Sequence, residues 1–230
     1  MIGIIGAMEE EVSQIADMMT GISEKIMADM VFKQGTVRGK DVVVVRSGIG
    51  KVNAAICTQI LATVYNVDSV INTGVAGSLR NEINIGDIVL STDALQHDMD
   101  ATGFGYKPGV IPRMKTSDFE ADTRLIEMAE QACREAVPEV GVFRGRVVSG
   151  DQFVSDKAAK DRIQENFDAY CTEMEGAAIA QAAYLNNIPF LIIRAISDKA
   201  DGSATMDYSE FERKAIEHSV RLLENMIDRM

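Results

Sequence analysis

Cysteine and histidine are scarce in this chain of 230 residues. The cysteines, Cys57, Cys133 and Cys171, lie far apart and form no Cys-x-x-Cys pair, so neither a disulfide framework nor a thiolate metal site is indicated. The histidines, His97 and His218, are too scattered to predict a zinc site or a serine triad. We therefore expect reduced thiols in the core, and the sequence predicts neither a metal nor a cofactor.

Long apolar runs and an excess of positive charge are also lacking. No stretch reaches the ~18 apolar residues of a membrane span, and the N-terminal sequence MIGIIGAMEEEV does not resemble a signal peptide. The formal net charge of −12 opposes binding to the phosphates of nucleic acid or to an anionic lipid surface. We therefore expect a cytoplasmic protein that binds neither nucleic acid nor membrane.

Short apolar runs alternate with helical patterns along the whole chain, which is typical of a sheet covered by helices. With 47% hydrophobic residues and no linker or repeat, residues 1–230 are predicted to form a single α/β domain. The segment Arg38-Gly39-Lys40-Asp41 predicts a tight hairpin because Gly39 can adopt a positive φ. The central sheet is therefore predicted to be mixed rather than wholly parallel.

The expected elements follow from these patterns. Strands are predicted at Ile2–Ile5, Val31–Val37, Val42–Arg46, Ser69–Thr73, Asp87–Leu90, Gly141–Val148 and Phe190–Ala195. Helices are predicted at Glu9–Met19, Val52–Tyr65, Phe119–Ala136, Asp156–Asn166, Met174–Asn186 and Ser209–Ile227, the last with a capping-box-like start at Asp207 and Glu210. The stretch from Thr92 to Asp118 has no clear periodicity and is long for a loop, so we expect it to be functional or to pack on a partner.

Glycine and acidic residues gather directly after several predicted strands. These segments are Gly6–Glu11, Ser47–Gly50, Gly74–Gly77, Ser149–Phe153 and Ile196–Asp198. In open α/β sheets, ligands bind beyond the carboxyl ends of the strands, and glycine lets the backbone approach a ligand closely. Acids at several strand ends can therefore converge on one ligand.

Three of these acids are candidates for catalysis, and each also has a structural explanation. Glu11 belongs to a run of glutamates at the start of a helix, where carboxylates complement the helix dipole. Glu175 precedes a run of small residues suited to close packing, where a buried carboxylate must be paired or functional. Asp198 follows an apolar strand and could simply cap a helix.

Several familiar motifs are absent. The segment Ser47-Gly48-Ile49-Gly50-Lys51 lacks the leading glycine of a phosphate loop, and Val52 stands where Ser or Thr is required, so ATP binding is not supported. Gly74–Gly77 contains G-x-x-G rather than the dinucleotide fingerprint. The neighbours His97 and Asp98 are typical of a surface pair rather than of metal ligands.

Taken together, the motifs resemble the 5′-methylthioadenosine/S-adenosylhomocysteine nucleosidases of the purine nucleoside phosphorylase superfamily over essentially the whole chain. The resemblance is specific because several segments occur in order at family-like spacing: Gly3–Val12, Ser47–Ala55, Asn72–Gly74, Ser149–Asp151, Glu173–Glu175 and Arg194–Asp198. It implies a nucleoside phosphorylase-like fold. It also implies hydrolysis of 5′-methylthioadenosine, S-adenosylhomocysteine and 5′-deoxyadenosine to adenine and a 5′-substituted ribose.

The resemblance also assigns roles to individual residues. Glu11 is similar to the base that activates water, Asp198 to the acid that protonates purine N7, and Glu175 to the residue that holds the ribose hydroxyls. Residues that match the family's substrate contacts are Met8, Ile49, Val75, Phe153, Val154, Glu173, Met174, Arg194, Ser197 and Tyr208. Phe104 and Pro112 resemble residues that a neighbouring subunit contributes, which implies a homodimer.

Within the substrate set, the resemblance distinguishes the parts of the nucleoside. Phe153 would stack on adenine, and the backbone near Val154 would read the adenine edge. Met174 would line the ribose. The ribose and the 5′-alkylthio group would be bordered by Met8, Ile49 and Tyr208.

Two positions depart from the family pattern. Many members have Ser in place of Val75, so a hydroxyl contact there is lost or is supplied by Ser78. Many have Phe in place of Tyr208, whose added hydroxyl a buried site would need to satisfy. Neither change touches the three carboxylates, so these positions bear on affinity more than on reaction type.

The reaction itself explains the need for carboxylates. Breaking a ribosyl–purine bond builds positive charge on the sugar while adenine leaves as a poor anion. Asp198 would have to hold a proton for the purine, which burial behind Ile193 and Ile196 favours. Glu11 is expected to be ionised to accept a proton from water, and Glu175 to favour the nearby cation.

A phosphate-dependent phosphorylase of the same superfamily is the main alternative. A phosphate site needs Arg, Lys or free backbone N–H groups, and carboxylates repel a dianion. Glu9, Glu10 and Glu11 therefore favour hydrolysis. Arg46 and Arg194 leave some room for an anion, although Arg194 could instead orient the water or pair with Glu11.

Two further alternatives remain open at the level of sequence. A futalosine hydrolase would use the same acids on a substrate with a different 5′ group. A nucleoside-binding protein without catalysis belongs to another class, but simple binding does not require acids at three separate strand ends.

Overall fold

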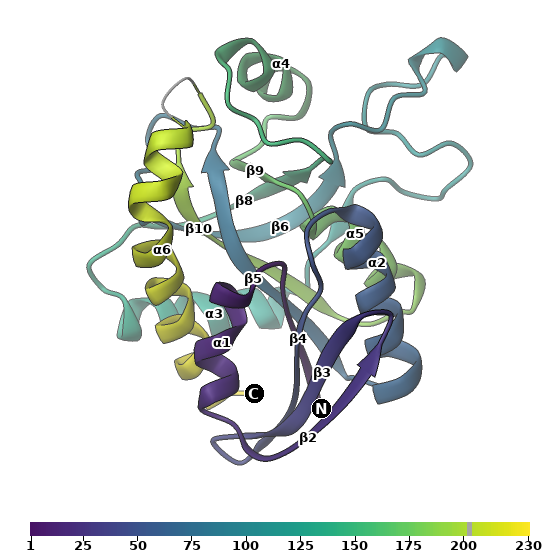
Figure 1. The fold of residues 1–230 in the computed structure, drawn as a ribbon. Coiled ribbons are helices and arrows are strands. Elements are labelled where there is room, and N and C mark those ends of the chain that lie inside the picture. The colour runs from purple at the N-terminus through teal and green to yellow at the C-terminus, as the bar shows by residue number, and fades with distance from the viewer. Residues whose placement is uncertain (202–203) are drawn as a thin grey trace.

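A mixed β-sheet forms the centre of the computed structural model, with helices on both of its faces (Figure 1). The structure describes residues 1–201 and 204–230, and the side chains of residues 205–210 lie outside that description. The strands are β1 (Ile2–Gly6), β2 (Thr20–Met27), β3 (Met30–Val37), β4 (Lys40–Arg46), β5 (Ser69–Ser78), β6 (Ile88–Gln96), β7 (Phe119–Glu120), β8 (Val142–Ser149), β9 (Cys171–Glu173) and β10 (Phe190–Asp198). The predicted α/β class and mixed sheet are confirmed.

The helices fall on the two faces of this sheet. They are α1 (Glu9–Asp17), α2 (Lys51–Ile60), α3 (Thr123–Ala136), α4 (Lys157–Phe167), α5 (Gly176–Leu185) and α6 (Ala204–Ile227), with a π-helical turn η1 (Leu61–Tyr65) and a 3-10 turn η2 (Thr102–Phe104). α2 packs against α5 on one side, while α6 contacts both α1 and α3 on the other (Figure 1). None of the described helices is long and apolar enough to span a membrane.

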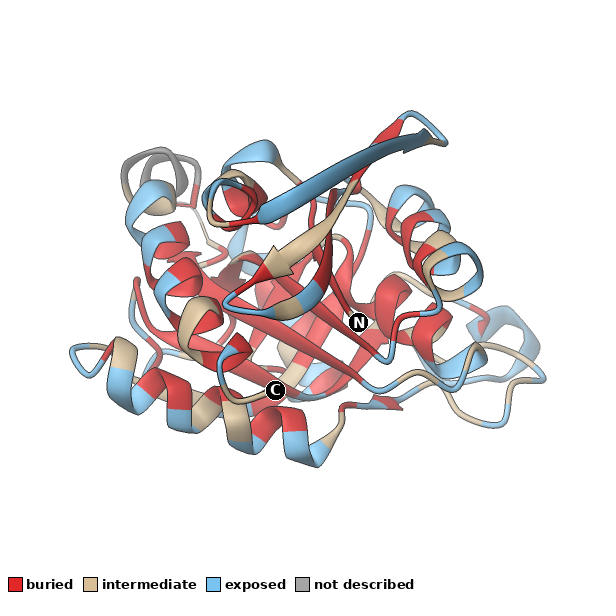
Figure 2. Ribbon diagram, turned by 90° about the horizontal axis from the view of Figure 1, so that it is seen from below, coloured by how far each residue is buried: buried red, intermediate tan, exposed pale blue. Residues whose placement is uncertain are grey.

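Part of the sheet closes on itself. β10 pairs with β6, β6 with β8, β8 with β9, β9 with β5, and β5 pairs back with β10; we call these strands the closed ring. From β5 the sheet continues through β1, β4, β3 and β2, which we call the open wing. The outer strand of the wing, β2, is almost wholly exposed, whereas the central strands are buried (Figure 2).

Strand direction brings distant loops together at one edge of the sheet. β1 runs parallel to both β4 and β5, so Gly6 lies beside Arg46 and the segments that follow the two strands leave the sheet together. β10 runs parallel to β5 and pairs Asp198 with Gly77. β8 and β9 also run parallel and end side by side at Ser149 and Glu173.

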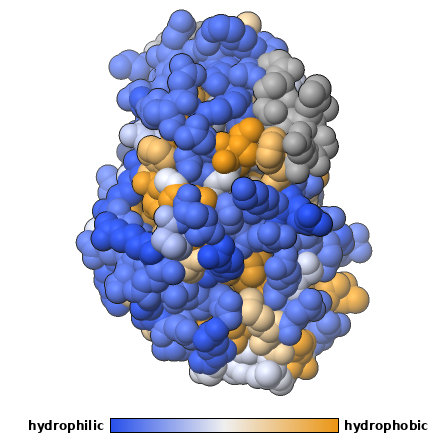
Figure 3. Space-filling model, turned by 90° about the vertical axis from the view of Figure 1, so that its left-hand side faces the viewer, coloured by the Kyte–Doolittle hydropathy of each residue, from blue (hydrophilic) through white to orange (hydrophobic). Residues whose placement is uncertain are grey.

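The core consists mainly of Ile, Val, Leu and Ala from the two sheet faces and the inner sides of the helices. In α3 the buried positions Leu125, Ile126, Ala129 and Cys133 recur at helical spacing, which turns one stripe of the helix to the sheet. A second, smaller core lies beneath α4 and includes Ile163. Away from these layers the surface is mainly polar, with apolar side chains in small groups on the face that Figure 3 shows.

The cysteines are free and buried, as expected. Burial raises the pKa of the Cys57 and Cys171 thiols far above the ordinary value, and it raises the pKa of Cys133 to about 12. These thiols are therefore packing groups rather than nucleophiles.

The hairpin between β3 and β4 forms as predicted. Arg38 and Gly39 both have positive φ, at 49° and 77°, which is the backbone of a two-residue hairpin turn. The predicted strands that became β1, β3, β4 and β8 have nearly the bounds expected. Strong local patterns were sufficient at these places.

Several element boundaries were predicted wrongly. The helix expected from Phe119 begins at Thr123, because Asp122 caps it through the backbone N–H of Leu125 and the preceding residues pair with β6 as β7. The expected helix start at Ser209 is also wrong, since α6 begins at Ala204; the side chains of Asp207 and Glu210 lie outside the described residues. The expected strand Ser69–Thr73 continues to Ser78, where it pairs with β9.

Candidate active site

Glu11 lies in the first turn of α1, and its carboxylate turns inward. Its Oε2 accepts hydrogen bonds from the backbone N–H groups of Ala7 at 2.7 Å and Met8 at 3.0 Å, and its Oε1 accepts one from Val75 at 3.2 Å. Burial raises the pKa of this carboxyl above its ordinary value, while the Arg194 guanidinium and the three N–H groups act in the opposite direction. A buried carboxylate with a raised pKa is suited to accept a proton near neutral pH.

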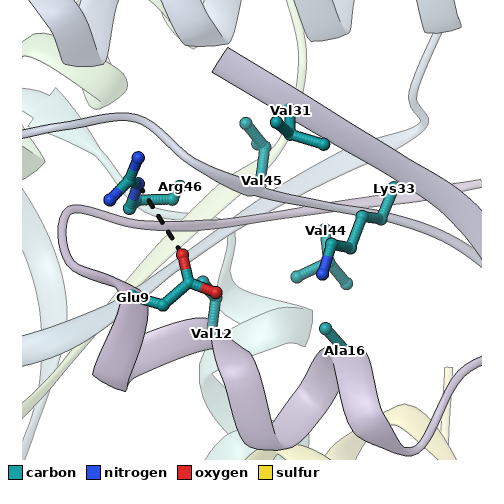
Figure 4. Close-up of a pocket in the computed structure, with 8 residues that line it drawn as sticks. All are labelled: Glu9, Val12, Ala16, Val31, Lys33, Val44, Val45 and Arg46. Atoms are coloured by element: carbon teal, nitrogen blue, oxygen red, sulfur yellow. Dashed lines mark ion pairs between the residues drawn. The ribbon is translucent and has the colours of Figure 1, made fainter. Parts of the chain in front are cut away.

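The adjacent glutamates behave differently. Glu9 and Glu10 are exposed, and Glu9 points toward Arg46, with 3.7 Å between the charged groups (Figure 4). The cavity between α1 and the wing that Figure 4 shows has a volume of about 50 Å³, which has room for little more than a water molecule. Of these three glutamates, Glu11 alone is buried.

Glu175 immediately precedes α5 and is also buried. Its Oε1 accepts a hydrogen bond of 2.7 Å from the backbone N–H of Gly50, which follows β4. Burial, followed by the negative charge of Glu173, raises the pKa of Glu175 to about 8. Burial and the neighbouring charge therefore favour the protonated form of Glu175 in the ligand-free protein, whereas the sequence predicted an ionised carboxylate beside the cation that forms on the ribose.

Asp198 ends β10 and is 2% exposed. Its Oδ2 accepts a hydrogen bond of 2.9 Å from the hydroxyl of Ser197, and its Oδ1 accepts one of 2.7 Å from the backbone N–H of Ala200. A Cβ at Gly77, its partner on β5, would lie 2.7 Å from Oδ1. Asp198 is therefore held by its own loop and needs glycine beside it.

Glu173 and Arg194 form an ion pair that is enclosed by protein, with 4% and 2% of the respective side chains exposed. Glu173 Oε2 contacts the guanidinium through Nη2 and through Nε at 3.2 Å, and Oε1 accepts the hydroxyl hydrogen of Ser149. Arg194 Nη2 also donates to Oδ1 of Asn72. The charges of this pair are directed at each other, whereas the sequence predicted both residues as substrate contacts.

Ser149 and Asn72 were missed as site residues by sequence reasoning, although both lie in segments that support the family resemblance. Asn72 donates from Nδ2 to the carbonyl of Ile5 at 2.9 Å and so links the ion pair to β1. A lone amide within an apolar strand is the signal that could have identified it. Ser149 carries no comparable signal, because a serine at a strand end is common.

Two openings lie beside the segments that carry the carboxylates. The first is a narrow cleft of about 30 Å³ beside Asp198, lined by Gly77, Gln152, Phe153, Val154, Thr172, Glu173, Met174 and Asp198. The second, of about 530 Å³, is lined by Ala7, Met8, Glu9, Glu10, Ala28, Asp29, Met30, Arg46, Ser47, Gly48, Ile49 and Asn53. The structure thus groups Phe153, Val154 and Met174 with Asp198, and it groups Met8 with Ile49 near Glu11.

The remaining predicted contacts are Val75, Tyr208, Phe104 and Pro112. Val75 contributes its backbone N–H to Glu11, and the side chain of Tyr208 lies outside the described residues. Phe104 is 88% exposed on the long loop after β6, and Pro112 is half-buried on the same loop. Phe104 therefore makes little contact within its own chain.

His97 and Asp98 are not the surface pair that was predicted. His97 is half-buried and lies against Gly150, where a Cβ would lie 2.5 Å from the imidazole ring, and burial lowers its pKa. Asp98 pairs with the Lys51 amine at 2.5 Å, and Gln96 accepts a further hydrogen bond from that amine at 3.0 Å. The lysine of the segment that partly resembles a phosphate loop is thus already bound.

The described residues contain no group of three or more His, Cys, Asp or Glu side chains that could hold a metal ion. The candidate site instead contains buried carboxylates, each with different neighbours. Such an arrangement suits proton transfer and stabilisation of a nearby cation.

Known proteins give a consistent comparison. The Phosphorylase superfamily profile matches residues 1–228. The 5′-methylthioadenosine/S-adenosylhomocysteine nucleosidase of Anoxybacillus flavithermus is 42% identical over 230 residues, which cover 100% of this chain and 98% of that protein. The enzyme of the same name from Staphylococcus carnosus is 42% identical over 228 residues, covering 99% of each.

Solved structures extend this comparison to the fold. The Neisseria meningitidis 5′-methylthioadenosine/S-adenosylhomocysteine nucleosidase in complex with methylthio-immucillin-A has a TM-score of 0.95 and 37% identity, covering 100% of this chain and 99% of that one. The futalosine hydrolase of Helicobacter pylori has a TM-score of 0.93 and 33% identity, covering 100% and 97%. The fold is therefore shared by enzymes that differ in substrate.

Proposed function

This chain belongs to the Phosphorylase superfamily and, within it, to the 5′-methylthioadenosine/S-adenosylhomocysteine nucleosidases, and we propose that it hydrolyses the N-glycosidic bond of adenine nucleosides with a 5′-thio substituent. The proposed substrates are 5′-methylthioadenosine and S-adenosylhomocysteine, with 5′-deoxyadenosine as a further one. The products are adenine and the 5′-substituted ribose.

The position of the Glu11 carboxylate best supports hydrolysis over phosphorolysis. It accepts hydrogen bonds from the N–H groups of Ala7, Met8 and Val75, which are the kind of donors that a phosphate would need. Arg194 is paired with Glu173, and Lys51 with Asp98. A phosphate dianion would meet a carboxylate and no unpaired cation among these groups, whereas water needs only a base.

Glu11 is proposed to accept the proton of the attacking water. Its raised pKa brings the carboxyl closer to the working pH, and its three N–H bonds hold it in one orientation. A general base in this position contributes about 10²–10⁴-fold to the rate.

Asp198 is proposed to donate a proton to N7 of the departing purine. The Ser197 hydroxyl and the Ala200 N–H hold its carboxyl at the edge of the cleft that Phe153 and Val154 line. Protonation of the ring makes adenine a better leaving group, again worth about 10²–10⁴-fold. Phe153 is 51% exposed beside this cleft, and its ring is proposed to stack on adenine.

Glu175 is proposed to hold the ribose hydroxyls, with Met174 against the sugar. Positive charge that develops on the ribose favours the ionised carboxylate, so it lowers the raised pKa of Glu175, whose proton passes to solvent water. The interaction is then stronger in the transition state than in the ground state, which is the condition for acceleration.

The 5′ substituent is proposed to lie toward Met8 and Ile49, at the larger opening. Tyr208, together with Phe104 and Pro112 of a neighbouring copy, would complete its apolar surroundings. An aromatic side chain as exposed as Phe104 favours such a contact between subunits. A cytoplasmic homodimer of single-domain chains is therefore part of the proposal.

The decisive experiment measures adenine release from 5′-methylthioadenosine in phosphate-free buffer. We expect many turnovers per active site and free 5-methylthioribose as the second product. A requirement for phosphate, with a ribose 1-phosphate product, would contradict hydrolysis. Stoichiometric binding without turnover would instead favour a nucleoside-binding protein.

Futalosine hydrolysis is a second candidate because the Helicobacter pylori enzyme has so similar a fold. The same assay with futalosine, S-adenosylhomocysteine and 5′-deoxyadenosine would rank the substrates. We expect the thio-substituted adenosines to have the highest kcat/KM.

A further inference from the structure

The Glu173 carboxylate is engaged on both oxygens by protein groups. Oε1 accepts the hydrogen bond of the Ser149 hydroxyl. Oε2 contacts Arg194 and also accepts the backbone N–H groups of Glu175 at 3.2 Å and Gly176 at 2.8 Å. Burial acts to raise the pKa of Glu173, but the Arg194 guanidinium beside it holds that pKa below the ordinary value. Glu173 lines the narrow cleft beside Asp198, but both oxygens of its ionised carboxylate are engaged by protein groups.

One set of contacts connects Glu173 to the proposed general base, Glu11. Gly74 marks the place where Arg194 and Glu11 approach, since a Cβ there would lie 2.6 Å from Oε1 of Glu11 and 3.3 Å from Nη1 of Arg194. Arg194 also donates to Asn72, which in turn donates to a carbonyl of β1, the strand that leads directly to Glu11. Glu173 holds the same guanidinium through Nε and Nη2.

A second set of contacts connects Glu173 to the segments that are proposed to bind the ribose and the purine. The bonds to the N–H groups of Glu175 and Gly176 place a negative charge at the N-terminus of α5, where the helix dipole favours it. The Ser149 hydroxyl accepts the next N–H, that of Ala177, at 2.6 Å. The N–H of Gly150 donates to the backbone carbonyl of Glu173 at 3.1 Å, which joins the segment that continues to Phe153.

We propose that Glu173 is a positioning residue that, through Arg194 and Ser149, holds the loops of Glu11, Glu175 and Phe153 in one arrangement, while its own carboxylate makes no hydrogen bond to the substrate. This inference rests on the proposed function, because the reaction of that site is the readout. It assigns to Glu173 a different role from that of the carboxylate two residues later, although both flank Met174.

Glu173 also acts on its neighbours through charge. Groups from several elements face Glu175. They are Glu173 in β9, Arg194 in β10, Glu11 in α1 and the backbone N–H of Gly50, which precedes α2. Removing the charge of Glu173 removes a repulsion from Glu175 and leaves Arg194 to interact with Glu11 and Glu175. Both effects favour the ionised forms, so the two carboxyls would lose their protons at lower pH.

The test compares Glu173→Gln with Ser149→Ala, using 5′-methylthioadenosine from pH 5 to pH 9. For Glu173→Gln we expect kcat to fall about 10²-fold through misplacement of the reacting groups. The rising limb of kcat/KM should also move to lower pH by about one unit or more. Ser149→Ala removes a link but no charge, so kcat should fall while the limb stays in place.

Glu127→Gln, which changes an exposed acid on α3, is the matched control and should retain wild-type rates. A Glu173→Gln variant with wild-type kcat and an unchanged limb would overturn the inference, as would a rise in KM alone, which indicates a substrate contact. If that variant does not fold, Ser149→Ala decides, and wild-type kcat in it overturns the inference. Absence of adenine release by the wild-type protein would instead reject the proposed function.

Discussion

The backbone N–H of Gly50 donates a hydrogen bond of 2.7 Å to the Glu175 carboxylate across 125 positions of sequence. Gly50 has a φ of 96°, and a Cβ there would lie 3.3 Å from the Asp151 carboxylate. The link between the wing and α5 therefore depends on glycine, for conformational as well as steric reasons.

Gly50→Ala should weaken this link. We expect a loss of stability of about 1–3 kcal/mol from backbone strain and a higher KM, because Glu175 loses a group that fixes it. Chemical denaturation and steady-state kinetics measure the two effects. Unchanged values of both would mean that the loop adopts another backbone at no cost.

Glu11→Gln should reduce kcat by about 10²–10⁴-fold while KM changes little, because the amide keeps the shape of the side chain but cannot accept the proton. Steady-state kinetics with 5′-methylthioadenosine would measure this. Glu127→Gln, an exposed acid on α3, provides the control. A rate within a factor of two of wild type would remove Glu11 from the proposed mechanism.

Asp198→Asn should largely abolish turnover while binding of a substrate analogue persists. The amide can keep a hydrogen bond with Ser197 or Ala200, but it has no proton to give to the purine. Calorimetric titration and a turnover assay on the same preparation separate the two properties. Near-normal turnover would exclude Asp198 as the acid.

Stability should depend on pH through Glu175. Its pKa of about 8 in the folded protein exceeds the ordinary value of 4.5, so between these values the folded state binds a proton that the unfolded state has lost. The free energy of unfolding should therefore fall as pH rises from about 5 to 8, by up to ~1.4 kcal/mol per unit from this group. Glu175→Gln should flatten that part of the profile in thermal melts, and an equally steep profile in the variant would contradict the assignment.

Gly77→Ala should displace Asp198. The added Cβ would lie 2.7 Å from Oδ1 of Asp198 and 2.9 Å from the Cβ of Ala200, so the loop must shift. We expect kcat to fall by about 10²-fold, as for a misplaced catalytic group. Gly103→Ala is the control for the effect of the substitution on Tm. It should leave Tm unchanged, since a Cβ there has no neighbour within 4 Å. Full activity in Gly77→Ala would show that Asp198 tolerates the shift.

Local patterns predicted the parts of the fold that local physics determines. The hairpin at Gly39 and the buried runs of β1 and β4 are examples, because turn chemistry and apolar runs are visible in the sequence. β2 was not predicted because it is an edge strand without a buried face, so its sequence shows no clear alternation of apolar and polar residues. β9 was missed because three residues are too few for a pattern.

Some parts of the candidate site could likewise be predicted from sequence, and others could not. The segments that contain Glu11, Glu175 and Asp198 could be identified from sequence, and the structure distinguishes Glu11 from Glu9 and Glu10 by burial. The pairing of Glu173 with Arg194 could not be predicted, because β9 and β10 do not pair with each other and meet only through their common neighbour β5. The raised pKa of Glu175 could not be predicted either, because it follows from burial first and from the nearby charge of Glu173 second.

Because the ring is closed, its strands should unfold less easily than the outer strands of the wing. An edge strand can fray one hydrogen bond at a time, whereas each ring strand is held on both sides. Asp198 belongs to the ring, and Glu11 follows a strand of the wing. Partial unfolding that begins at the wing's edge and spreads to β1 would therefore remove the proposed base while the acid is still in place, so the activity of this chain should be lost before most of its structure.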